Sequence, residues 1–402
     1  MEIGGLYMFQ LDQKEYAIWE EGTAISMSIT GHCLVTVIPK LPKSSASSFM
    51  GYLKTIIDQA LNDDDVFDLR FLSGIFIPSC YEKSVVTPDA KALLSAWGNS
   101  WIHTYDYNDG HCTLRPGPCV LRDGILFPAW RIYEDTANAF SLPLRLPKES
   151  ESFAPMRIGS SHHSSRCVAV PSRMAKFAGE SLPLTGLRIA VKDNFDMCGI
   201  RTSLGSRHYL HLGQPALKTS PVVQALMDAG ANIIGLTQMC SMVLKQEPTQ
   251  CIDFPAPFNP RGDGYQSPSG GSSGQAAAIA SYKWLDAAIG SDSVVCPLLL
   301  TDVSLTVRLW VSLHVKGCGQ ALRKHSLTLH EKLPPYLLFT TDPLGPESSP
   351  QKDITIAFLR DVERILGIPA KQFSVSDAWK NNPPAQALGL SISEYLNADV
   401  RL

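Results

Sequence analysis

Charged residues and metal-binding motifs are scarce in this sequence. Asp, Glu, Lys and Arg together make up 18% of its 402 residues, and the formal net charge is −3. No run of Lys and Arg residues is present, which argues against nucleic acid as a partner, because phosphate binding needs concentrated positive charge. No CxxC pair and no HExxH motif occur either. We therefore expect no metal site.

Long apolar segments are missing as well. Residues 1–6 lack a basic stretch followed by an apolar core, so we expect no signal peptide. The apolar runs elsewhere are short and interrupted, which argues against a membrane span. Ten cysteines in a chain without a secretory signal indicate reduced thiols rather than a disulfide framework. These features together predict a cytoplasmic protein that does not associate with membranes.

The first part of the chain, residues 1–150, carries signals for both helices and strands. Apolar periodicity predicts helices at 48–61 and 90–101. Residues 118–127 read as a hairpin whose turn is Asp123-Gly124. We therefore predict a small α+β domain. It serves either as a packing extension of the rest of the chain or as a module that caps a substrate or binds a partner.

A polar, Ser-rich stretch over residues 151–180 predicts a linker. Beyond it, residues 181–402 change to an α/β pattern. A strand is expected at 187–191, a helix with an N-terminal serine cap and a terminal glycine at 220–230, and a strand at 232–237. This order predicts a parallel strand pair, and hence an α/β fold with a layered sheet covered by helices.

A lone lysine and a glycine-serine loop stand out because of their order and spacing. Lys192 follows the apolar residues 189–191. Ser272 comes 80 residues later in a Gly-Gly-Ser-Ser-Gly sequence, and the apolar run 276–280 after it predicts a helix. The Gly-Ser-Asp sequence at 290–292 predicts a turn. Taken singly, a strand-end lysine that reaches solvent and a flexible turn are ordinary features.

In combination, these features give the segment 186–293 a clear resemblance to the amidase signature family. The flanking residues that extend the resemblance are Lys192-Asp193-Asn194-Phe195-Asp196, Gly199 to Ser203, Asp228 to Ala231 and Phe258-Asn259-Pro260. The resemblance implies an amidase-signature-type layered fold with a mixed sheet covered by helices. It also implies hydrolysis of a carboxamide C–N bond in a small-molecule substrate, without a cofactor.

The resemblance assigns a role to each matching residue. In the family a neutral lysine takes a proton from a serine held by a cis peptide, and that serine relays the proton of a nucleophilic serine. Lys192 matches the lysine, whose charged form must be disfavoured by burial, and Ser272 matches the relay. The residues that match the substrate-binding and oxyanion-binding surroundings are Gly270, Gly271, Ser273 and Ser293. The helix after the loop offers the positive end of its dipole.

The nucleophile position departs from the family pattern. The family's serine falls 24 residues after the relay, and that position holds Cys296 here. Val294 and Val295 replace two glycines of the family motif. Valine resists the positive-φ conformations that glycine adopts, so the oxyanion donors of this turn are expected to be misaimed. Cys296 is either a thiol nucleophile or an inert buried cysteine, and both interpretations stay open.

Downstream of Cys296 the resemblance fades. Residues 303–330 contain no Asp or Glu and follow no helical or strand period, so we interpret 294–345 as atypical, from a shifted reading frame or a misplaced exon boundary. Helical patterns return at 353–367 and 391–396. Fewer residues follow Cys296 than in the family, and we therefore expect a shortened amidase-signature domain.

Two functional hypotheses remain. The first is an amidase-like hydrolase that uses Lys192, Ser272 and Cys296, with a role in secondary metabolism suggested by resemblance to fungal relatives. The second is a catalytically degenerate homologue that acts as a binding or interaction protein, or a truncated gene product. The sequence leaves the oligomeric state open, and a homodimer is one of the states considered.

Overall fold

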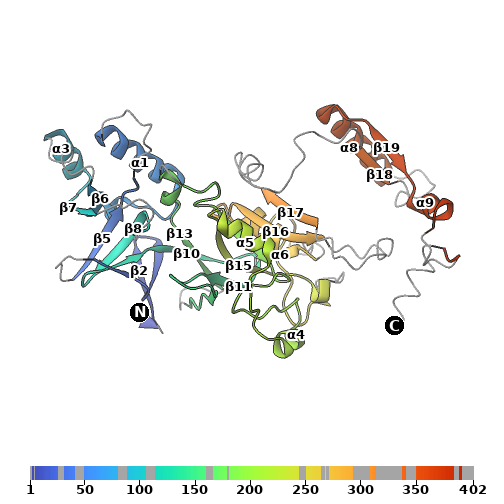
Figure 1. The fold of residues 1–402 in the computed structure, drawn as a ribbon, viewed down its shortest axis with the longest axis horizontal. Helices are drawn as coiled ribbons and strands as arrows, with labels where there is room; N and C mark the ends of the chain where they lie inside the picture. The colour runs from blue at the N-terminus through green and yellow to red at the C-terminus, as the bar shows by residue number, and fades with distance from the viewer. Residues whose placement is uncertain are drawn as a thin grey trace. The chain divides into compact units, whose positions relative to one another are not determined.

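The structure is a computed structural model, drawn in Figure 1. It describes residues 2–3, 5–25, 31–40, 49–79, 88–105, 114–159, 166–178, 181–243, 250–263, 268, 271–292, 308–313, 337–340, 350–383 and 389–391. The chain divides into two compact units, Met1–Asp292 with Arg308–Lys324, and Ser293–Val307 with His325–Leu402. The fold is α/β, with mixed sheets and helices, as the sequence predicted.

A six-stranded sheet is built from the first part of the chain, in the order β4-β9-β8-β5-β6-β7. Its strands are β4 (Thr23–Ala24), β5 (His32–Val37), β6 (Gly74–Pro78), β7 (Trp101–Tyr105), β8 (Gly117–Arg122) and β9 (Ile125–Pro128). Strands β5, β6 and β7 are parallel, whereas β8 and β9 pair antiparallel. The parallel strands are joined through helices α1 (Phe49–Asp63) and α3 (Pro88–Ala96).

Three predictions for this region can be compared with the structure. Helix α1 confirms the predicted helix, and it buries an apolar face formed by Leu53, Ile56, Ile57 and Ala60. The hairpin is also confirmed, with both turn residues at positive φ, 49° at Asp123 and 76° at Gly124. The helix predicted to reach residue 101 instead ends at Ala96. The chain then turns at Gly98, whose φ is 76°, and enters β7 at Trp101.

A five-stranded antiparallel sheet lies beside the first, in the order β1-β2-β3-β10-β13. Its strands are β1 (Glu2–Ile3), β2 (Leu6–Leu11), β3 (Lys14–Trp19), β10 (Trp130–Glu134) and β13 (Cys167–Pro171). Every residue of β13 is buried, although this strand falls inside the predicted linker 151–180. The expected boundaries at 150 and 180 therefore lie within the first compact unit.

The mixed sheet that carries the candidate site has the order β12-β11-β15-β14-β16-β17. Its strands are β11 (Phe140–Arg145), β12 (Ala154–Pro155), β14 (Arg188–Lys192), β15 (Asn232–Thr237), β16 (Ala287–Asp292) and β17 (Arg308–Leu313). The helices of this part are α4 (Arg207–Leu212), α5 (Pro221–Asp228) and α6 (Ser273–Ser281). Strand β14 is parallel to both neighbours, β15 and β16, which confirms the predicted parallel pair.

Two local predictions in this sheet need correction. The Gly-Ser-Asp sequence was expected to form a turn, but Gly290–Asp292 end strand β16, because they pair with the antiparallel strand β17. Ser220 does precede helix α5, yet its side chain makes no cap hydrogen bond. The predicted stop at Gly230 holds, with a φ of 99°.

A buried arginine joins three segments of the first unit. Arg188 is fully buried at the start of β14. Its guanidinium donates to the Pro171 carbonyl at 2.6 Å and to the Trp284 carbonyl at 3.2 Å. It also bonds the Asp65 carboxylate at 2.8 Å. Next to it, Tyr133, Phe140, Tyr282 and Trp284 stack, with ring centroids 5.0 to 6.3 Å apart. The first part of the chain therefore packs directly on the mixed sheet.

The second unit contains a small β-α-β arrangement. Strands β18 (Leu337–Thr340) and β19 (Ala370–Phe373) pair in parallel, and helix α8 (Pro350–Leu366) connects them. Helix α9 (Val375–Asn381) follows. The helix predicted at 353–367 is thus confirmed, with Gly367 at a φ of 65°. Strands β17 and β18 fall in the stretch expected to be atypical. Of the helical turn predicted at 391–396, residues 392–396 lie outside the described residues.

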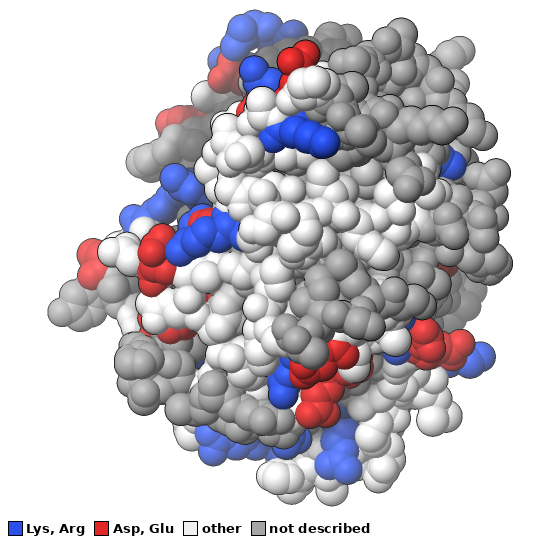
Figure 2. Space-filling model, turned by 90° about the vertical axis from the view of Figure 1, so that its left-hand side faces the viewer, with Lys and Arg blue, Asp and Glu red and all other residues white. Residues whose placement is uncertain are grey.

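Three short 3-10 helices complete the described elements: η1 (Leu69–Leu72), η3 (Met174–Phe177) and η4 (Ser241–Val243). On the face drawn in Figure 2, basic and acidic side chains are interspersed and much of the described surface is uncharged. Within the described ranges, no helix is long and apolar enough to cross a membrane. The same residues hold no group of three His, Cys, Asp or Glu side chains arranged to bind a metal ion.

Candidate functional site

The candidate site lies where two parallel strands and a helix meet. Lys192 is the last residue of β14, and Ser291 is near the end of the parallel strand β16. Ser272 directly precedes helix α6, which packs against both strands. Because parallel strands end at the same edge of a sheet, the fold collects these three residues at one place. The carboxyl edge of an open α/β sheet is the usual position of a ligand site.

Hydrogen bonds to Ser291 join the predicted site residues. The side chain of Lys192 is fully buried, and its Nζ donates to the Ser291 carbonyl oxygen at 3.1 Å and to the Ser291 Oγ at 3.0 Å. The Ser272 Oγ donates to the same carbonyl oxygen at 3.2 Å. Asn194 Nδ2 donates to the Ser291 Oγ at 2.8 Å. The lysine and the serine that sequence reasoning paired are thus brought to a common acceptor.

Gly290 makes room for the Ser272 hydroxyl. A Cβ atom built on Gly290 would lie 2.8 Å from the Ser272 Oγ and 3.3 Å from its Cβ. Real Cβ atoms essentially never come closer than 3.0 Å to another heavy atom. The glycine of the Gly-Ser-Asp sequence is therefore needed for close approach between strand β16 and the loop before α6, rather than for a turn.

Asp193 fixes the segment that follows β14. It is buried and accepts hydrogen bonds from the Ser203 backbone N–H, at 3.1 Å, and from the Ser203 hydroxyl. Burial raises the pKa of this carboxyl above its ordinary value, while the two hydrogen bonds oppose that rise. The Ser203 Oγ in turn accepts from the Gly205 N–H at 3.1 Å. Lys192 and Asn194 therefore hydrogen-bond to Ser291, whereas Asp193 between them holds the following loop at Ser203.

Gln275 is a site residue that sequence reasoning missed. It is buried in the first turn of α6. In the orientation that satisfies its amide, the side-chain nitrogen donates to the Ser272 carbonyl at 3.0 Å, and the oxygen accepts from the Lys192 backbone N–H at 3.1 Å. Its oxygen also accepts from the Thr237 hydroxyl. One amide therefore links the loop before α6 to strand β14. The sequence signal for it was a glutamine in a helix whose other residues are small or apolar.

Helix α6 begins tightly against the end of β15. The Gly274 N–H donates to the Gln238 carbonyl at 3.0 Å, and the Gln238 N–H donates to the Ala139 carbonyl at 2.8 Å. A Cβ on Gly274 would lie 2.5 Å from the Gln238 backbone. This contact fixes the helix N-terminus, the positive end of its dipole, next to Ser272. Ser273, the other serine of the loop, is buried at the start of this helix.

Of the remaining predicted site residues, Gly271 lies next to Ser272 in the described part of the chain. It is partly buried, and its peptide bond to that serine is trans rather than the cis form implied by the family resemblance. The other predicted positions, Gly270, Ser293 and Cys296, lie outside the described residues.

Comparison with known proteins identifies the segment that forms this site. Residues 167–297 match the family model described as Amidase. Amidase 1 of Oryza sativa subsp. japonica is 39% identical over 116 residues, 28% of this chain and 26% of that protein. Amidase 1 of Arabidopsis thaliana is 36% identical over 110 residues, 27% of this chain and 25% of that protein. The chain thus spans about a quarter of the length of the curated relatives it matches.

Among solved structures, allophanate hydrolase from Kluyveromyces lactis matches 55% of this chain and 45% of its own, with a TM-score of 0.35 and 21% identity. The family match begins at the first residue of β13 and spans β14, β15, β16 and α6. It therefore contains Lys192, Ser272 and Ser291. Residues 167–297 of this chain are therefore similar to the amidase family.

Proposed function

We propose that this protein hydrolyses a carboxamide through an acyl-enzyme intermediate, with Lys192 as the base and Ser272 as the relay. The observation that supports this proposal best is that the Lys192 amine and the Ser272 hydroxyl both reach the Ser291 carbonyl oxygen. Two proton-carrying groups that share one acceptor are close enough for a small rotation of either side chain to join them.

The chemistry requires an uncharged amine, since an ammonium cannot accept a proton. Lys192 is fully buried, and burial disfavours the charged form of an amine. We propose that Cys296, at the position of the family's nucleophile, attacks the carbonyl carbon and forms a thioester. Its proton passes through the Ser272 hydroxyl to Lys192, and from there to the leaving amine. Water then hydrolyses the thioester, which releases the carboxylic acid and restores the thiol.

The surroundings supply order and charge stabilisation for these steps. Asn194 and Gln275 hold Ser291 and the Ser272 backbone in place by hydrogen bonds. Helix α6 directs the positive end of its dipole toward this edge, where negative charge develops on the substrate oxygen. The proposed substrate is a small-molecule amide. From the sequence alone, we also propose a cytoplasmic location and a role in secondary metabolism.

Hydroxylamine trapping tests the mechanism. A carboxamide substrate is incubated with the full chain in the presence of hydroxylamine, and the hydroxamate formed from the acyl-enzyme is measured. We expect the Lys192→Ala variant to form at most about a hundredth of the hydroxamate, because general base catalysis contributes roughly 100-fold or more. Thermal melting of both proteins shows whether the variant is folded. Equal hydroxamate from two folded proteins would rule out the mechanism.

A further inference from the structure

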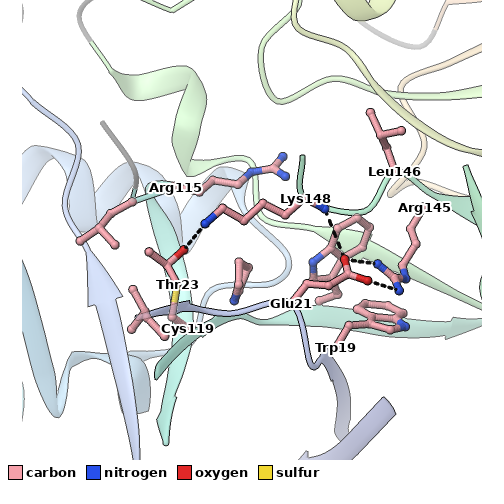
Figure 3. A pocket seen from close by; sticks show the side chains of 12 residues that line it. Trp19, Glu21, Thr23, Arg115, Cys119, Arg145, Leu146 and Lys148 are labelled. Atoms are coloured by element: carbon pink, nitrogen blue, oxygen red, sulfur yellow. Dashed lines mark hydrogen bonds and ion pairs between the residues drawn. The ribbon is translucent and has the colours of Figure 1, made fainter. Parts of the chain in front are cut away.

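A pocket in the first unit, separate from the site around Lys192, is shown in Figure 3. It has a volume of about 190 Å³, so it has room for a small molecule rather than a single water. Its walls come from all three sheets of this unit, with Trp130 on β10, Cys119 on β8 and Arg145 on β11. A cavity at the meeting point of several sheets is a common position for a ligand site.

One wall of the pocket is formed by the ion pair between Arg145 and Glu21. Arg145 donates two parallel hydrogen bonds to the Glu21 carboxylate, at 2.6 and 2.7 Å. Its guanidinium also lies over the Trp19 ring, 5.0 Å from the centroid. Arg145 lowers the pKa of Glu21 through these hydrogen bonds, and burial opposes the effect only in part. The Glu21 carboxylate is therefore ionised at neutral pH, and its charge offsets that of Arg145.

Two further cations in the lining are bonded to neutral groups. Arg115 donates to the Asn232 side-chain oxygen at 2.6 Å, and Lys148 donates to the Thr23 hydroxyl at 3.0 Å. The Lys148 backbone N–H donates to the Glu21 carboxylate at 3.3 Å, whereas its Nζ forms an ion pair with the Glu149 carboxylate at 3.7 Å. Glu149 is 85% exposed, so water screens this ion pair strongly. Among the described residues Arg115 forms no ion pair. In the part of the chain that the structure describes, no buried carboxylate therefore balances the positive charge of these two side chains.

An apolar surface lies next to these cations. Trp19 and Trp130 meet edge to face, with ring centroids 5.2 Å apart, and both line the pocket. Leu114 and Leu126 add aliphatic surface. The Cys119 thiol is also present, but burial raises its pKa to about 12, so it remains a neutral and unreactive contact at physiological pH.

We propose that this pocket binds a small organic monocarboxylate. Its carboxylate accepts hydrogen bonds from Lys148 and Arg115, and its apolar body packs against Trp130 and the leucines. A carboxylate fits the charge of the site, and the aromatic and aliphatic walls select an apolar body over an inorganic anion. This inference does not depend on amide hydrolysis at Lys192.

The test uses benzoate as the probe and benzamide as its neutral analogue of equal shape. Binding to the full chain is followed by tryptophan fluorescence, since two tryptophans line the pocket, and by calorimetry. We expect saturable benzoate binding, with a dissociation constant of about 1 mM, and at least tenfold weaker binding of benzamide, because charge-assisted hydrogen bonds are about twice as strong as neutral ones. Inorganic phosphate is expected to bind no better than benzamide.

Variants locate the binding. Lys148→Gln and Arg115→Gln are each expected to weaken benzoate binding about tenfold. Lys54→Gln removes an equal charge from an exposed position on α1 and should leave binding unchanged. Ser272→Ala should also leave it unchanged, which separates this pocket from the hydrolytic site. The proposal would be overturned if benzamide or phosphate bound as tightly as benzoate. It would also be overturned if both folded pocket variants bound benzoate as the parent does, or if Ser272→Ala lost binding.

Discussion

Lys192 and Ser272 both donate a hydrogen bond to the backbone carbonyl oxygen of Ser291, at 3.1 and 3.2 Å. They lie 80 residues apart in the sequence, and they are brought together by the parallel pairing of β14 with β16 and by the packing of helix α6 on both strands. The acceptor is a main-chain atom of a strand. The positions of the Lys192 amine and the Ser272 hydroxyl therefore both depend on the backbone of β16, which makes the site sensitive to small changes in that strand.

Removing the Ser291 hydroxyl should impair the proposed reaction while preserving the backbone acceptor. In Ser291→Ala, the Lys192 Nζ loses its 3.0 Å partner and Asn194 Nδ2 loses its 2.8 Å partner. A buried hydrogen-bonding group left without its partner costs about 1–3 kcal/mol, so we expect kcat/KM for carboxamide hydrolysis to fall about 5- to 150-fold. The pH profile of kcat/KM should shift as well. Thr202→Ala, in the neighbouring loop, is the control, and an unchanged pH profile in Ser291→Ala would contradict the positioning role.

Gly290→Ala should displace Ser272, the proposed relay. Its new Cβ would lie 2.8 Å from the Ser272 Oγ, so the Ser272 side chain has to rotate or the strand has to shift. We expect hydrolysis to fall by at least about 100-fold, because misplacing a reacting group by about 1 Å has an effect of this size. Gly159→Ala is the matched control, because nothing lies within 4 Å of the Cβ it would add. Retained activity in Gly290→Ala would show that Ser272 does not take part.

Arg188→Met should destabilise the first unit. The substitution keeps most of the buried volume but removes the hydrogen bonds to Pro171 and the pairing with Asp65. Breaking one side of a buried ion pair costs about 3–5 kcal/mol, so we expect a clear fall in the midpoint of urea denaturation. Arg201→Met, at an exposed position, should have an effect within about 0.5 kcal/mol. Similar urea midpoints for the two variants would mean that Arg188 does not stabilise the packing of the segments around Asp65, Pro171 and Trp284.

The Asp68 cluster should contribute to stability in a pH-dependent way. Arg70 and Lys14 donate to this carboxylate, and they hold its pKa well below the ordinary value of 3.8. The folded pKa is the lower one, so the contribution is fully present above pH 4 and is lost as the pH falls further. Asp68→Asn should therefore lower the melting temperature at pH 6, and the difference from the parent should shrink between pH 4 and pH 2. A constant difference across that range would be inconsistent with ionisation of Asp68.

Restoring the family's turn tests whether the altered nucleophile segment limits activity. The triple variant Val294→Gly, Val295→Gly and Cys296→Ser returns this segment to the family sequence. Glycines accept the backbone conformations that aim N–H groups at an oxyanion, and each such donor is worth roughly 3–4 kcal/mol. We therefore expect faster carboxamide hydrolysis than in the parent chain, measured as released ammonia or amine. Cys296→Ser alone is the control, and no gain in the triple variant would argue that more than this turn has changed.

Local patterns in the sequence were sufficient to predict many helices and strands of this fold. Helix α1, the hairpin at Asp123-Gly124 and the strand-helix-strand unit ending in β15 follow from periodicity and turn residues that act over a few positions. The errors arose where partners distant in sequence decide the structure. Gly290–Asp292 resemble a turn when taken alone, but pairing with β17 extends them into a strand.

The same distinction applies to the site. Lys192 and Ser272 were found from a spacing that matches a known family, whereas Ser291, Asn194 and Gln275 were not assigned a role. Ser291 forms hydrogen bonds with Ser272, Asn194 and Lys192, which lie 19, 97 and 99 positions away in the chain. The Gln275 amide links the loop before α6 to strand β14. No local signal encodes such contacts, because they exist only once β14, β16 and α6 are packed together.

By itself, the sequence determined that a buried strand ends in a lysine and that a glycine-rich serine loop opens a small, apolar helix. Both depend on residues adjacent in the chain, whose preferences act before any tertiary contact forms. Only the tertiary structure decided which atoms face each other. Parallel pairing of β14 and β16 placed Lys192 beside Ser291, and the missing side chain of Gly290 admitted the Ser272 hydroxyl. Steric exclusion and hydrogen-bond direction act through space, so the fold had to form before the site could exist.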